Sequence, residues 1–116
     1  ATASGEDYFA TQIEISRLAV AAWLAHAEGS SSAAVHLMRS AVRLEASTEK
    51  HPVTPGSLAP ASELLGDLLM ELDQPGAALE AYRASLRTWP GRRNSLEGAA
   101  HAESARASLL AIPSSG

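Results

Sequence analysis

The apolar residues of this chain are mostly Ala and Leu, and this feature limits the possible folds more than any other. The sequence has 24 Ala and 15 Leu among its 116 residues, whereas only 4% of the residues are aromatic. Ala and Leu favour helices, whereas sheets favour Val, Ile, Thr and aromatic side chains. The composition therefore predicts one small all-α domain of closely packed helices.

Charge and composition also exclude several classes of function. The chain has no Cys, which rules out disulfides, zinc fingers and thiol catalysis, and its net charge of −4 argues against general nucleic-acid binding. We find neither a secretory signal nor an apolar run long enough to span a membrane, and so expect a cytoplasmic location without membrane binding. Because the sequence does not begin with Met, we expect it to be processed or a fragment of a longer protein.

Turn signals, chiefly Gly and Pro, divide the chain into stretches whose apolar residues recur at helical spacing. None of the stretches has the alternating pattern of a strand. The short turns between most of them favour antiparallel hairpins. The expected helices cover residues 4–28, 32–47, 60–72, 76–88 and 93–110.

Small and large residues recur in the middle of the chain at the offsets of a known helical repeat. The pattern resembles the 34-residue tetratricopeptide repeat, which carries Trp-x2-Leu-Gly-x2-Tyr, then Ala-x3-Phe, then Pro. Ser62 stands at the Trp place. The matching residues are Leu65, Gly66, Ala78, Tyr82 and Pro90.

The resemblance implies an α-α superhelix of antiparallel helical hairpins, similar to bacterial tetratricopeptide proteins of undefined role. The last helix would act as the cap that stacked repeats need, with Leu96, Ala99 and Ala100 at its packing positions. The implied parts are a degenerate first hairpin (1–48), a Pro-rich insertion (49–58), a central hairpin (59–92), a capping helix (93–110) and a disordered tail (111–116).

In this family, the first helix of each hairpin lines a concave groove in which ligands usually bind. The resemblance therefore implies an acidic groove, which would attract a polar or basic peptide segment. Two alternatives stay open: the carboxylates simply solvate an exposed helix face, and Trp23 packs instead of lining the groove. The implied groove residues are Trp23, His26, Glu63, Asp67, Glu71, Glu97 and His101.

Two other groups of residues have simpler explanations. Glu97 and His101 are one helical turn apart and could bind a metal ion beside Glu63 or Asp67, but such pairs are common by chance. An arginine cluster lies near the C-terminus of the fourth helix, where cations complement the helix dipole, and we expect it to be solvated. The cluster consists of Arg83, Arg87, Arg92 and Arg93.

The sequence contains no motif that indicates catalysis. It lacks a Gly-rich phosphate loop, a nucleophile elbow and a His-Glu-x2-His motif. We therefore predict a non-catalytic protein–protein interaction module without cofactor or metal, which binds another protein or another region of its parent chain. The alternative is a structural segment of a longer helical solenoid, which would form homo-oligomers.

Overall fold

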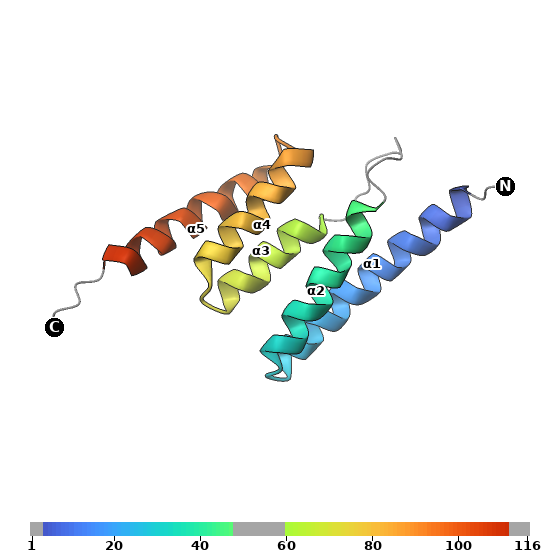
Figure 1. Ribbon diagram of the computed structural model, residues 1–116, viewed down its shortest axis with the longest axis horizontal. Coiled ribbons are helices and arrows are strands. Elements are labelled where there is room, and N and C mark those ends of the chain that lie inside the picture. Colours follow the sequence, from blue (N-terminus) through green and yellow to red (C-terminus); the bar gives the residue numbers. More distant parts are fainter. Residues whose placement is uncertain (1–3, 48–59, 112–116) are drawn as a thin grey trace.

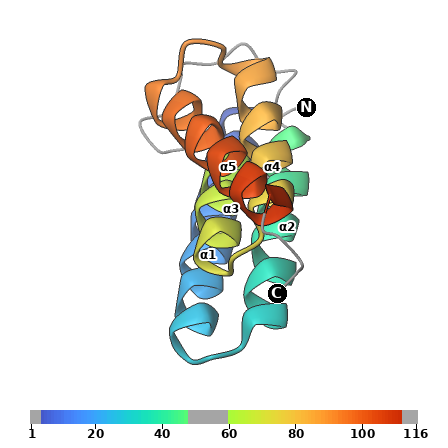
Figure 2. The same ribbon diagram turned by 90° about the vertical axis from the view of Figure 1, so that its left-hand side faces the viewer.

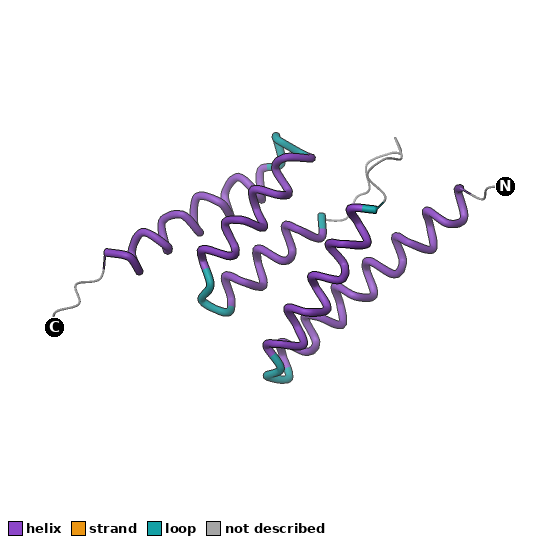
Figure 3. The backbone as a smooth tube through the Cα atoms, viewed as in Figure 1, coloured by secondary structure: helices purple, strands orange, loops and turns teal. Residues whose placement is uncertain are grey.

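The structure is a computed structural model that describes residues 4–47 and 60–111, and these residues form five helices and no strand (Figures 1 and 3). The predicted all-α class is therefore confirmed. No helix in these two ranges combines the length and the apolar character needed to cross a membrane. The helices are α1 (Ser4–Ala27), α2 (Ser31–Ala46), α3 (Ala61–Glu71), α4 (Pro75–Thr88) and α5 (Arg93–Ala111).

The observed bounds lie within one residue or so of the predicted ones. The predicted Pro-rich insertion at 49–58 lies outside the described residues, as do residues 112–116 of the predicted tail. Ala111, which was expected to begin that tail, is the last residue of α5.

The turns that close the two hairpins have the same backbone geometry. Gly29 and Asp73 both have a positive φ, 87° and 61° respectively. In each turn, the next amide donates to the carbonyl five residues earlier, at 2.8 Å from Ser30 and 2.9 Å from Gln74. This is the pattern of a Schellman C-cap, which reverses the chain and leaves room for the next helix to begin.

The helices pack as two hairpins followed by a single helix. Helix α1 packs against α2 and α3 against α4, while α2 also contacts α3 and α4 contacts α5. Figure 2 shows α1 and α3 on one side of the molecule and α2 and α4 on the other. No Cα atom of α2 lies within 8 Å of one of α4, so α3 bridges the space behind these two helices.

Small side chains dominate the core between α1 and α2, and larger ones the core between α3 and α4. The first hairpin buries mainly Ala, with Ile15 and Met38 as its large side chains. The second buries Leu and one tyrosine, Tyr82, which is 2% exposed. The large buried hydrophobic residues of the second hairpin are Leu65, Leu68, Leu69, Leu79 and Tyr82.

Tyr82 reaches its position because two glycines face its ring. A Cβ atom at Gly66 in α3 would lie 2.7 Å from the ring, and a Cβ atom at Gly98 in α5 would overlap it more severely. Tyr82 in α4 therefore packs against the backbones of both neighbouring helices. This close approach joins α3, α4 and α5 into one packed unit.

The predicted packing face of α5 was partly wrong. Ala99 packs against the core as expected, but Leu96 is 49% exposed and Ala100 is also exposed. The fully buried residues are Ser95 and Ala102. The buried face of α5 is thus shifted by one residue from the face that the 34-residue spacing predicts. Polar bonds between α3 and the start of α5, described below, determine how α5 is rotated about its axis.

Candidate functional site

Helix α3 carries the three predicted acidic residues at i, i+4 and i+8, but their environments differ greatly. Glu63 is completely buried, Asp67 is half-buried, and Glu71 is exposed. The helical spacing correctly places them along one side of α3. Helix α5 covers the beginning of that side, so only its far end is available to a partner.

Glu63 belongs to a polar cluster that we call the α3–α5 clamp (Glu63, Arg92, Asn94 and Ser95). Its Oε1 accepts hydrogen bonds from Arg92 Nε at 2.7 Å and from Ser95 Oγ at 2.6 Å. Its Oε2 accepts from Asn94 Nδ2 at 3.0 Å. Burial raises the pKa of Glu63, but these hydrogen bonds and the charge of Arg92 outweigh it, so the pKa lies below its usual value.

The clamp corrects two predictions. Glu63 is not a groove residue, because its carboxylate is enclosed and bonded to three side chains of its own chain. Arg92 is not merely solvated, because its guanidinium pairs with that carboxylate and its side chain is only 35% exposed. The pair attaches the turn between α4 and α5 to the start of α3.

Asp67 also has an internal partner. Its Oδ1 accepts a hydrogen bond of 2.5 Å from the hydroxyl of Tyr82. Burial and the nearby charge of Glu63 raise the pKa of Asp67 above its usual value, although the bond from Tyr82 works in the opposite direction. Burial, and then the bond to this carboxyl, raises the pKa of the Tyr82 hydroxyl as well. Asp67 therefore orients the tyrosine that joins the three last helices.

Three of the predicted site residues do come together, and we call them the tryptophan cluster (Trp23, His26 and Glu71). The rings of Trp23 and His26 meet edge to face, with centroids 5.7 Å apart. His26 Nε2 lies 3.7 Å from Glu71 Oε1, which bridges α1 and α3. The Glu71 side chain is 61% exposed, and Trp23 is half-buried against the core.

The remaining predicted residues, Glu97 and His101, are exposed on α5. In the described ranges they form no ion pair with each other or with the tryptophan cluster. The same ranges contain no group of three His, Asp or Glu side chains that could hold a metal ion. The alternative metal site beside Glu63 or Asp67 is therefore not assembled.

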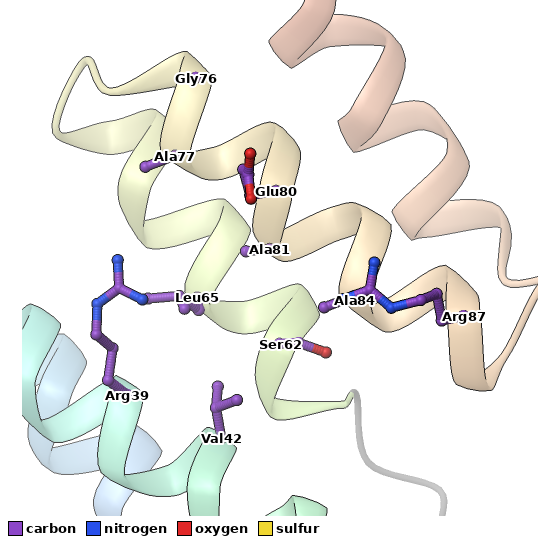
Figure 4. A pocket seen from close by; sticks show the side chains of 10 residues that line it. All are labelled: Arg39, Val42, Ser62, Leu65, Gly76, Ala77, Glu80, Ala81, Ala84 and Arg87. Carbon is purple, nitrogen blue, oxygen red and sulfur yellow. The ribbon is translucent and has the colours of Figure 1, made fainter.

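Sequence reasoning missed the partners of Glu63 because they lie 29 to 32 residues away along the chain. The sequence held one signal for them: Ser95 follows Ser62 by 33 residues, close to the 34-residue period of the repeat. In the structure both serine side chains are buried. Reasoning from the sequence also missed a hollow of about 570 Å³ between α2 and α4, lined by Arg39, Ser62 and Arg87 among others (Figure 4).

Comparison with known proteins gives no relative: the chain matches no protein-family model and has no significant match among curated proteins or solved structures.

Proposed function

We propose that this chain is a non-catalytic interaction module of the tetratricopeptide type, which binds a polar or basic peptide segment along α1, α3 and α5. The observation that carries the proposal is the tryptophan cluster, in which His26 contacts both the exposed carboxylate of Glu71 and the half-buried indole of Trp23 where α1 and α3 meet. The proposal includes a bacterial and cytoplasmic setting, which rests on the sequence alone.

The cluster has the chemistry that a cationic side chain needs. A Lys or Arg of a partner can pair with Glu71 and lie against the ring of Trp23, so that charge and cation–π attraction act together. Exposed Glu97 extends the negative charge along α5. Glu63 and Asp67 contribute by shaping the module from inside rather than by touching the partner.

The tetratricopeptide assignment is supported by the order and packing of the helices. Consecutive antiparallel hairpins are followed by a helix that packs on the second helix of the preceding hairpin. The glycine of the motif, Gly66, packs closely against the ring of Tyr82, which stands at the motif's aromatic place.

A peptide titration tests the proposal. A fluorescein-labelled peptide of alternating Lys and Ser is added to the native chain, to Glu71→Lys and to Glu97→Lys. We expect saturable binding that is several-fold weaker in both variants, whereas neither substitution should weaken any binding of the matched Glu and Ser peptide. Glu80→Lys, which reverses an exposed charge on α4, is the matched control and should bind like the native chain. Equal affinity of Glu71→Lys and the native chain would contradict the proposal.

A specific observation also favours the second candidate function, an oligomerising segment. Ile13, Val20 and Leu24 are 66%, 66% and 58% exposed, and their spacing places them on one face of α1, opposite the face that packs in the core. An exposed apolar stripe on a helix is a surface that a protein partner can cover. In this alternative, a second copy of the chain covers the stripe through the same face.

Sedimentation equilibrium distinguishes the two candidates. The oligomerising function predicts a dimer of the native chain that dissociates when Val20 and Leu24 are both replaced by Glu. The same substitution at Leu96, which is exposed on α5, should leave the dimer intact. A native chain that is monomeric at high concentration rules this candidate out and leaves the peptide-binding function untouched.

A further inference from the structure

We propose that the hollow between α2 and α4 is a second binding surface, which takes an acidic peptide segment with an apolar side chain at its centre. This surface faces away from the tryptophan cluster, because most of its lining comes from α2 and α4, the helices of the other layer, and only Ser62 and Leu65 come from α3 (Figures 2 and 4). It is therefore independent of the function proposed above, and the two surfaces prefer opposite charges.

The hollow exists because small side chains stand where larger ones would close it. Ser62 of α3 lies at its floor, at the place where the repeat that the sequence resembles has Trp. Ala77, Ala81 and Ala84 form the wall on α4. The backbones of α2 and α4 stay apart, with no Cα pair within 8 Å, so small side chains leave the space between these helices open.

Apart from Ser62, the floor of the hollow is apolar and suits one side chain of moderate size. Val42 from α2 and Leu65 from α3 contribute to it together with the alanines of α4. The volume of about 570 Å³ exceeds that of any single side chain, so a peptide could bury an apolar residue and part of its backbone. Burial of apolar surface supplies affinity without specifying charge.

The charge preference comes from two arginines that line the hollow. Figure 4 shows Arg39 on α2 and Arg87 on α4, at opposite sides of the lining. Neither guanidinium forms an ion pair within residues 4–47 and 60–111. Glu80 is the single acidic residue of the lining, which therefore has a net positive charge in a chain whose net charge is −4.

These features select an acidic peptide over other ligands. Carboxylates of Asp or Glu form paired hydrogen bonds with guanidinium groups, and one on each side of an apolar anchor would meet one arginine each. A nucleic acid is a poor fit, because it needs many phosphate contacts and this lining offers two cations, one anion and an apolar floor. The exposed stripe of α1 on a second copy is also a poor fit, because its Glu14 is already paired with Arg17.

Peptide display on the purified native chain tests the proposal. A random library of peptides is selected, and a labelled copy of the most enriched peptide is then titrated into single variants. We expect enriched peptides that carry Asp or Glu on both sides of an apolar residue. Arg39→Glu or Arg87→Glu should weaken binding about tenfold, which corresponds to the loss of one charge-assisted pair. Arg93→Glu, at the exposed start of α5, is the matched control and should change affinity less than twofold.

A second variant tests the hollow itself. Ser62→Trp fills it and should abolish binding of the enriched peptide while the helix content and the unfolding midpoint stay close to native. If that variant does not fold, Ala84→Leu narrows the hollow from a half-buried position and should weaken binding as well. The proposal is overturned if no peptide is enriched, if the enriched peptides have no acidic bias, or if the filled variant binds as the native chain does. Binding of a second copy in the hollow would also overturn it.

Discussion

Two glutamate–arginine pairs in this molecule have similar geometry and different surroundings. In α1, Arg17 donates to Glu14 from Nε at 2.9 Å and from Nη2 at 2.6 Å. Between α3 and the start of α5, Arg92 donates to Glu63 from the same atoms at 2.7 and 3.3 Å. The first pair is exposed and joins residues three apart, whereas the second encloses a buried carboxylate and joins residues 29 apart.

The difference shows that the value of an ion pair depends on burial and on what the pair connects. In both pairs the pKa of the glutamate is lowered. For Glu14 the main cause is the hydrogen bonding from Arg17. For Glu63 burial raises the pKa, and the hydrogen bonds and the charge of Arg92 outweigh it. The exposed pair holds together one helical turn that would form without it. The buried pair attaches α5, which otherwise contacts α3 only slightly.

Replacing each glutamate by Ala should give the largest difference in the free energy of unfolding between the buried pair and the exposed pair. Glu63→Ala leaves Arg92, Asn94 and Ser95 without their shared acceptor, and should lower the free energy of unfolding by about 3 kcal/mol. Glu14→Ala should leave it unchanged within error. Urea unfolding followed by circular dichroism measures both. Similar midpoints for the two variants would show that the clamp contributes no more than a surface pair.

A second contrast concerns the glycines around Tyr82. Gly98→Ala places a methyl group against a ring whose hydroxyl is held by Asp67, and should cost about 2 kcal/mol through overpacking. Gly76→Ala, in the first turn of α4, meets only an arginine side chain at 3.9 Å and should be neutral or slightly stabilising. Thermal unfolding of the two variants measures the difference, and a stabilised Gly98→Ala would contradict the packing described here.

Acid should weaken the clamp specifically. The pKa of Glu63 is lower in the folded chain than in the unfolded chain, so its contribution to stability is complete above roughly pH 4.3 and is lost as the pH falls further. Asp67 acts in the opposite direction, because its pKa is raised on folding and its protonation favours the folded state. Urea midpoints measured from pH 6 to pH 3 should therefore fall less steeply in Glu63→Ala than in the native chain, and equal slopes would exclude Glu63 as the cause.

The smallest expected loss of stability comes from Ser85, which lies at the edge of the α3–α5 clamp. The Ser85 and Ser95 hydroxyls are 2.8 Å apart, and Ser95 donates its own hydrogen to Glu63. Ser85 must then donate to Ser95, so Ser85→Ala should cost about 1 kcal/mol. Ser40→Ala removes an exposed bond from Arg43 and serves as the control without a measurable effect. Equal unfolding free energies for the two variants would place Ser85 outside the network.

The sequence was sufficient for the helices and their hairpins, and insufficient for the environments of the site residues. Gly29, the Pro and Gly signals and the helical spacing of Ala and Leu are local features, and they predicted the element bounds closely. Helical spacing also placed Glu63, Asp67 and Glu71 on one side of α3. It could not show which of them a distant segment covers.

The rotation of α5 shows the same limit. Position in the repeat predicted that Leu96 packs in the core, yet it is exposed while Ser95 is buried. The local sequence alone predicts that the apolar Leu96, and not the polar Ser95, is buried. Ser95 takes the buried place because it donates to Glu63, and because Gly98 then faces Tyr82. Such a combination of a polar bond and close backbone packing becomes apparent only when the helices are placed together.

Hydrogen exchange tests the central claim, that Glu63 fixes α5 to the rest of the molecule and is not a contact for partners. In a chain of stacked helices, the terminal helix opens locally when its attachment is weakened. Glu63→Ala should speed amide exchange throughout α5 and leave α1 and α2 as protected as in the native chain. Unchanged protection of α5 in that variant would contradict the claim.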